Sequence, residues 1–106
     1  MLTEEDRKIV AEFRRRLTPI VAILDLRVFG SRVRGDAEPD SDLDVFMVVE
    51  TCSPNLRQRI NELAWEVGFE LDRIISPLVV TAGQWAGGAM RANPLVLNIE
   101  REGIRW

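Results

Sequence analysis

The chain contains no histidine and a single cysteine, Cys52, among its 106 residues. Without histidine there can be no Ser-His-Asp triad, no histidine general base and no zinc site that needs an imidazole. One cysteine allows no disulfide within the chain. Any catalysis would therefore have to use carboxylates, hydroxyls, arginines, backbone amides and hard metal ions.

The chain also lacks a basic excess and long apolar runs. Its 14 basic and 17 acidic residues give a net charge of −3, which argues against general electrostatic capture of nucleic acid. No apolar run approaches the roughly 18 to 20 residues of a membrane span. The acidic N-terminus, residues 1–6, has no apolar segment typical of a signal peptide. We expect one domain over residues 1–106, in the cytoplasm and without a membrane partner.

Apolar periodicity predicts a small mixed α/β domain. The predicted helices have their apolar faces at helical spacing, and the predicted strands are short, apolar and partly alternating. In chain order the elements are a helix from Thr3 to Thr18, a strand ending at Phe29, a strand over 42–50, a helix from Ser53, a strand over 73–80, a short helix around 84–91 and a helix over 95–102.

Three local signals refine this order. Thr3 and Asp6 resemble a capping pair at the first helix. Pro77 cannot donate a hydrogen bond, so its strand should lie at an edge or carry a bulge. In the last helix we expect Leu95, Leu97 and Ile99 to be partly buried.

Two aspartates at the head of the second strand are the first candidate site residues. Asp42 and Asp44 are two apart, so on a strand both carboxylates project from one face. Two neighbouring anions on an apolar strand repel each other and are costly to desolvate, and a hard cation such as Mg²⁺ would stabilise them. The alternative is that Asp42 is simply an N-terminal strand residue or a turn residue whose carboxylate accepts hydrogen bonds from backbone amides.

Gly30 and Ser31 come where the first strand ends, and ten residues separate Ser31 from Asp42. Glycine permits a tight turn with exposed amide groups that can bind an anion, and the serine hydroxyl adds a donor. A phosphate cradle beside a two-carboxylate metal site has the parts needed to hold a nucleoside triphosphate. Arg32 and Arg34 could reach its outer phosphates, or could instead pair with the acids at 36, 38 and 40.

The stretch from Val28 to Gly35, followed by Ser41 to Val45, resembles the signature of the minimal nucleotidyltransferases of the polymerase β-like superfamily. The resemblance implies a nucleotidyltransferase fold, which is an α+β domain with a small mixed β-sheet flanked by helices. It also implies transfer of a nucleoside monophosphate, with ATP as substrate and Mg²⁺ as cofactor. By position, Gly30 and Ser31 would bind the triphosphate, and Asp42 and Asp44 would hold the metal. It also suggests the antitoxin of a HEPN–MNT toxin–antitoxin pair, whose partner is a helical toxin modified on tyrosine; a homo-oligomer is left open.

The sequence departs from this family at the third carboxylate. Active members carry an acid on a later strand, which helps to activate the acceptor hydroxyl, whereas residues 73–80 contain none. Asp72 is a candidate for that catalytic role, and the alternative is that it simply ends the preceding helix. Two functional hypotheses follow: an enzyme that modifies a partner protein, or a weakly active or inactive nucleotide-binding module that neutralises its partner by stoichiometric binding.

Overall fold

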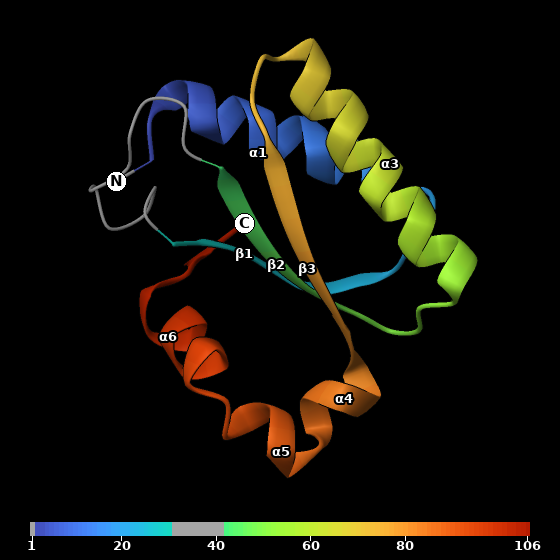
Figure 1. Cartoon of the computed structure of the whole chain (residues 1–106), viewed down its shortest axis with the longest axis vertical. Helices are drawn as coiled ribbons and strands as arrows, with labels where there is room; N and C mark the ends of the chain where they lie inside the picture. The colour runs from blue at the N-terminus through green and yellow to red at the C-terminus, as the bar shows by residue number, and fades with distance from the viewer. Residues whose placement is uncertain (1, 31–41) are drawn as a thin grey trace.

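The computed structural model describes residues 2–30 and 42–106. Its helices and strands follow the predicted order (Figure 1). They are α1 (Glu4–Leu17), β1 (Ile23–Phe29), β2 (Leu43–Val49), α3 (Pro54–Glu70), β3 (Ile75–Thr81), α4 (Ala82–Ala86), α5 (Gly88–Arg91), α6 (Pro94–Glu102) and β4 (Ile104–Arg105).

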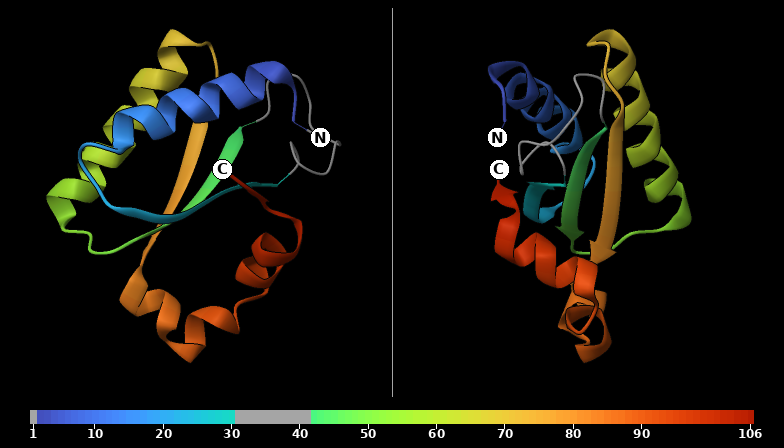
Figure 2. Two further views of the ribbon diagram at one scale, coloured as in Figure 1. Left: turned by 180° about the vertical axis from the view of Figure 1, so that it is seen from behind. Right: turned by 60° about the vertical axis from the view of Figure 1, so that its left-hand side comes forward.

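In the described part of the chain the strands form one mixed sheet in the order β3-β2-β1-β4. Strand β1 pairs antiparallel with β2 and with β4, whereas β2 and β3 run parallel. Figure 2 shows α1 and α3 together on one side of this sheet and α4, α5 and α6 on the other. The mixed sheet with flanking helices confirms the predicted fold class.

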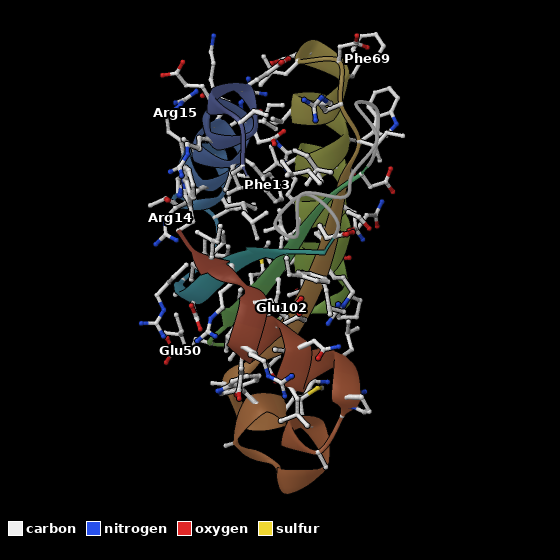
Figure 3. All side chains as sticks on the ribbon, turned by 90° about the vertical axis from the view of Figure 1, so that its left-hand side faces the viewer. Phe13, Arg14, Arg15, Glu50, Phe69 and Glu102 are labelled. Atoms are coloured by element: carbon white, nitrogen blue, oxygen red, sulfur yellow. The ribbon has the colours of Figure 1, made fainter. Side chains whose placement is uncertain are left out.

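The main core lies between the sheet and helices α1 and α3. Figure 3 shows Phe13 pointing from α1 into the space between these two helices, and its side chain is fully buried. Alternation along the strands explains which residues the sheet contributes. They are Leu26 and Val28 of β1, Leu43, Val45, Met47 and Val49 of β2, and Ile75 and Val79 of β3.

Helix α1 begins as predicted, with Thr3 and Asp6 in a reciprocal capping box. The Asp6 N–H donates to Thr3 Oγ1 and the Thr3 N–H donates to Asp6 Oδ2, both at 3.0 Å. Asp6 is also fully buried, and Arg73 Nη1 donates to its Oδ1 at 3.0 Å. This ion pair between Asp6 and Arg73 was not predicted from the sequence. It connects the start of α1 to the turn before β3.

Pro77 lies on an edge strand, as predicted. Leu43 N–H donates to the Ile74 carbonyl at 2.8 Å, so the parallel register turns the backbone of Pro77 and Val79 toward the free edge of β3. Pro77 has no N–H that could donate to another strand at this edge, and Arg57 of α3 donates to the Val79 carbonyl at 3.3 Å. Both features reduce pairing with a foreign strand.

The last third of the chain departs from the expected helices. The single helix around 84–91 is two short helices, because the backbone at Gly87 is extended, with φ −72° and ψ 131°. In α6 the buried side chains are Val96 and Ile99. The expectation for Leu95 and Leu97 was wrong: they are 47% and 44% exposed. Leu97 lies two residues before Ile99 and therefore on a different face of the helix, and Val96, three residues before Ile99, takes the inward position.

Beyond this helix, Ile104 and Arg105 pair with β1 as a short strand that was not among the predicted elements. Among the described residues, no helix is both long enough and apolar enough to cross a membrane.

Candidate functional site

The two predicted metal-binding aspartates lie where β2 begins. Asp42 immediately precedes the strand and is exposed, and Asp44 is its second residue and half-buried. The alternation that buries Leu43 and Val45 in the main core turns Asp44 to the other side of the sheet, as it does Phe46. Phe46 and Val48 continue this face inward, and both are buried.

Gly30 lies against Asp44 as the motif requires. Antiparallel pairing places Phe29 opposite Asp44, so the residue that ends β1 meets the head of β2. Gly30 has φ +86°, a backbone conformation that costs an L residue about 1 to 2 kcal/mol. A Cβ atom at this position would lie 2.4 Å from Asp44 Oδ2. Glycine is therefore needed here both for its conformation and for the close approach.

This side of the sheet is covered over only part of its length. Phe46, Val48, Val80 and Ile99 form a small buried cluster there, against which Trp85 and Met90 pack. The rings of Phe46 and Trp85 are 5.5 Å apart. Toward the start of β2 the burial ends: Asp42 and the neighbouring Ser76 of β3 are exposed. We call this uncovered region, formed by Gly30, Asp42, Asp44, Ile74 and Ser76, the open face.

The donor set on the open face fits a hard divalent cation. Asp42 and Asp44 supply carboxylate oxygens, and Mg²⁺ is typically held by one or two carboxylates together with waters and substrate phosphates. Because Gly30 has no side chain, Asp44 Oδ2 comes within 2.4 Å of where a Cβ would lie, and the backbone of this turn can approach a bulky anion. Over residues 2–30 and 42–106, no three Asp, Glu or Cys side chains gather closely enough to enclose a metal ion.

Asp72 lies in the turn between α3 and β3, exposed and with φ +58°. Arg73 N–H donates to the Gly68 carbonyl at 2.8 Å, which is the bond of a Schellman motif with Asp72 as its left-handed residue. Ending the helix therefore explains this residue structurally, as the alternative reading of the sequence had it. Its catalytic role stays a prediction.

The remaining predicted nucleotide-binding residues, Ser31, Arg32 and Arg34, lie outside the described residues. So do the acids with which the two arginines could pair. Ser76 is a member of the open face that the sequence analysis missed. Its place within the third strand was visible in the sequence, but the register that sets it beside Asp44 was not.

A separate cavity of about 480 Å³ lies at the other end of β1. In it Asp25 Oδ1 is buried and has no hydrogen-bond partner among the described residues, although Arg105 Nε lies 3.4 Å away. The lining residues share no member with the predicted site. They are Arg14, Leu24, Asp25, Leu26, Val48, Ala82, Trp85, Arg105 and Trp106.

Solved structures similar to this chain have related folds. A toxin–antitoxin crystallised with AMP-PNP is 20% identical with a TM-score of 0.63, over 98% of this chain and 73% of that one. The toxin–antitoxin MntA–HepT is 19% identical with a TM-score of 0.54, over 96% of this chain and 69% of that one. A structure named "putative minimal nucleotidyltransferase" is 24% identical with a TM-score of 0.54, over 93% and 86%.

Sequence comparison goes further than the fold. A "Putative protein adenylyltransferase" of Methanocaldococcus jannaschii is 34% identical over 76 residues, which are 68% of this chain and 76% of that protein. The family model described as "Nucleotidyltransferase domain" matches residues 7–82, the stretch that contains β1, β2 and β3. This match shows that the chain belongs to the nucleotidyltransferase domain family.

Proposed function

We propose that this chain transfers a nucleoside monophosphate, AMP from ATP, to a hydroxyl group of a partner protein, and that it depends on Mg²⁺. The approach of Gly30 to Asp44 carries the proposal, because it places a glycine turn without a side chain directly beside a carboxylate. A triphosphate bound at the turn would present its phosphates to Asp42 and Asp44. The chain's similarity to a protein named as an adenylyltransferase supports AMP as the transferred group.

In the proposed reaction the hydroxyl oxygen of the acceptor forms a bond to the α-phosphorus of ATP. The bond between that phosphorus and the oxygen bridging to the β-phosphate breaks, pyrophosphate leaves, and the hydroxyl proton passes to solvent or a nearby carboxylate. Asp42 and Asp44 would hold Mg²⁺, which offsets the developing negative charge when bound. Gly30 would let the phosphates approach the backbone, with Ser31, Arg32 and Arg34 as the further predicted ligands.

The proposed acceptor is a toxin protein, so that the chain acts as an antitoxin in the cytoplasm. Two toxin–antitoxin structures share this fold, and one of them was crystallised with an ATP analogue. The open face supports a large acceptor, because its exposed Asp42 and Ser76 give a partner direct access to the reacting phosphate.

A label-transfer assay tests this function. The chain is incubated with the proposed toxin, Mg²⁺ and ATP labelled at either the α- or the γ-phosphate. We expect α-label, but not γ-label, to become attached to the toxin. The double variant Asp42→Asn and Asp44→Asn should lose this transfer, because amides cannot replace two anionic ligands. Transfer that survives in the double variant would reject the proposed site.

The second candidate function is neutralisation by binding alone. Two observations favour it: β3 brings a neutral residue, Ser76, beside Asp44, and α3 exposes a stacked aromatic pair suited to a protein interface. The rings of Trp65 and Phe69 are 5.3 Å apart, with exposures of 68% and 75%. If the double aspartate variant still neutralises the toxin at one-to-one stoichiometry, binding is sufficient. Loss of neutralisation with retained complex formation supports the enzyme.

A further inference from the structure

The strand beside β2 brings its own side chain onto the open face. Strands β2 and β3 pair in parallel with Asp44 opposite Ser76. Neighbouring strands lie about 4.8 Å apart, and paired residues project from the same face of a sheet. Ser76 is exposed, so its hydroxyl can reach a ligand held by Asp44.

Burial along β3 confirms the direction of this side chain. Ile75 and Val79 belong to the core beneath α1 and α3. Leu78 and Val80 belong to the opposite cluster, together with Phe46. Because side chains alternate along a strand, Ser76 lies on the side of Leu78, which is also the side of Asp44.

No charge from β3 accompanies this hydroxyl. The neighbouring residue toward Asp42 is Ile74, whose carbonyl accepts the Leu43 N–H at 2.8 Å. Its side chain is apolar and 62% exposed. At the start of β2 and β3, with the residue that precedes each strand included, the side chains on the open face are therefore two carboxylates, one hydroxyl and one alkyl group.

We propose that Ser76 is the third side chain of the Asp42–Asp44 site, and that its neutrality makes divalent cation binding depend on the nucleotide. Cation affinity at oxygen sites rises with the number of charged ligands, so two carboxylates and a hydroxyl hold the bare ion weakly. The triphosphate supplies the missing anionic oxygens, and cation and nucleotide bind together. This inference rests on the proposed function, since it assigns the same site to a nucleotide.

The test is a titration of the intact chain with Mn²⁺, followed by electron paramagnetic resonance, with and without a non-hydrolysable ATP analogue. The wild-type chain should bind Mn²⁺ at least about tenfold more tightly with the analogue than alone. Ser76→Asp should tighten binding of Mn²⁺ alone by about tenfold or more, because a third carboxylate would lie close to a doubly charged ion. With the analogue present the gain should be less than about threefold.

Two controls separate charge from position. Ser76→Asn has the shape of the aspartate variant without its charge and should not tighten binding of Mn²⁺ alone. Asn55→Asp adds the same charge at an exposed position near the start of α3, at the opposite end of β2, and should change binding by less than about twofold. Ser76→Glu provides a second acidic variant if the aspartate perturbs the strand.

The outcomes distinguish this inference from the proposed function. A wild-type chain that fails to bind Mn²⁺ together with the analogue contradicts the proposed function itself. If it does bind them but neither acidic variant tightens binding of Mn²⁺ alone, the placement of Ser76 is overturned. Equal wild-type affinity for Mn²⁺ with and without the analogue would overturn the dependence on nucleotide.

Discussion

At the scale of single residues, Gly30 connects the sequence motif to a physical requirement. The motif indicated a glycine because a phosphate has to approach the backbone there. The structure adds that Asp44 Oδ2 occupies the place where a side chain would begin. That second reason could not be predicted, because it depends on the pairing of Phe29 with Asp44 across two strands separated in the sequence.

Replacing Gly30 with alanine tests this requirement. The new Cβ would have to displace the Asp44 carboxylate in a backbone with φ +86°, so we expect a loss of stability of about 1 to 3 kcal/mol and at least tenfold weaker nucleotide binding. Thermal unfolding and calorimetry measure the two effects. Gly83→Ala is the matched control, since a Cβ there meets no atom closer than 3.9 Å; equal effects of both variants would contradict the argument.

Asp72 gives a second prediction at this scale. An aspartate with φ +58° at the end of α3 is strained relative to glycine, so Asp72→Gly should stabilise the chain by about 0.5 to 1 kcal/mol. Chemical denaturation measures this change. An unchanged or lower stability would contradict the capping role. Label transfer by the same variant separately tests the predicted catalytic carboxylate.

At the scale of elements, some features of α1 could be predicted from the sequence and others could not. Its cap and its buried face follow from local spacing, and both were predicted correctly. The distant partners of its arginines were not predicted, because they come from elements far away in the sequence. Arg14 Nη1 donates to the Trp106 carbonyl at 2.5 Å, and Arg16 forms an ion pair with Glu70 of α3 at 2.5 Å. Figure 3 shows Arg14 and Arg15 on the outer side of this helix.

The same helix contains a carboxylate with a lowered pKa, that of Glu12. Hydrogen bonds from Arg15 and Arg16 lower the pKa of Glu12 from its ordinary 4.5 to about 2. A lowered pKa in the folded state stabilises the fold above the ordinary value, and this contribution is lost as the pH falls from about 4.5 to 2. Glu12→Gln should therefore reduce the decline of the melting temperature over that interval.

A thermal-unfolding series from pH 5 to pH 2 measures this dependence. Glu100→Gln on α6 removes one carboxylate elsewhere on the molecule and serves as the control. If the melting temperatures of the wild-type and Glu12→Gln chains fall equally between pH 4.5 and pH 2, the prediction is contradicted. The ionised Glu12 carboxylate would then contribute no pH-dependent stability over that interval.

At the scale of the whole molecule, the predicted fold was correct where apolar periodicity is strong and wrong where it is weak. Three of the strands and the helices α1 and α3 lie close to their expected places. The region of α4, α5 and α6 was expected less accurately, because Gly87 and Pro94 interrupt short helices whose buried faces depend on the sheet beneath them. Those helices set the limit of the open face, since they cover Phe46 and Val48 but leave Asp42 exposed and Asp44 half-buried.

The central claim is that this uncovered part of the sheet holds the nucleotide and its cation. Crystals grown with Mn²⁺ and a non-hydrolysable ATP analogue test it most directly, because anomalous scattering locates the manganese without assumptions about activity. We predict an anomalous peak at coordinating distance from the carboxylates of Asp42 and Asp44, with the phosphates of the analogue beside Gly30. Manganese and nucleotide bound elsewhere, for instance in the cavity beside Asp25 and Arg105, with none at the two aspartates, would contradict the account.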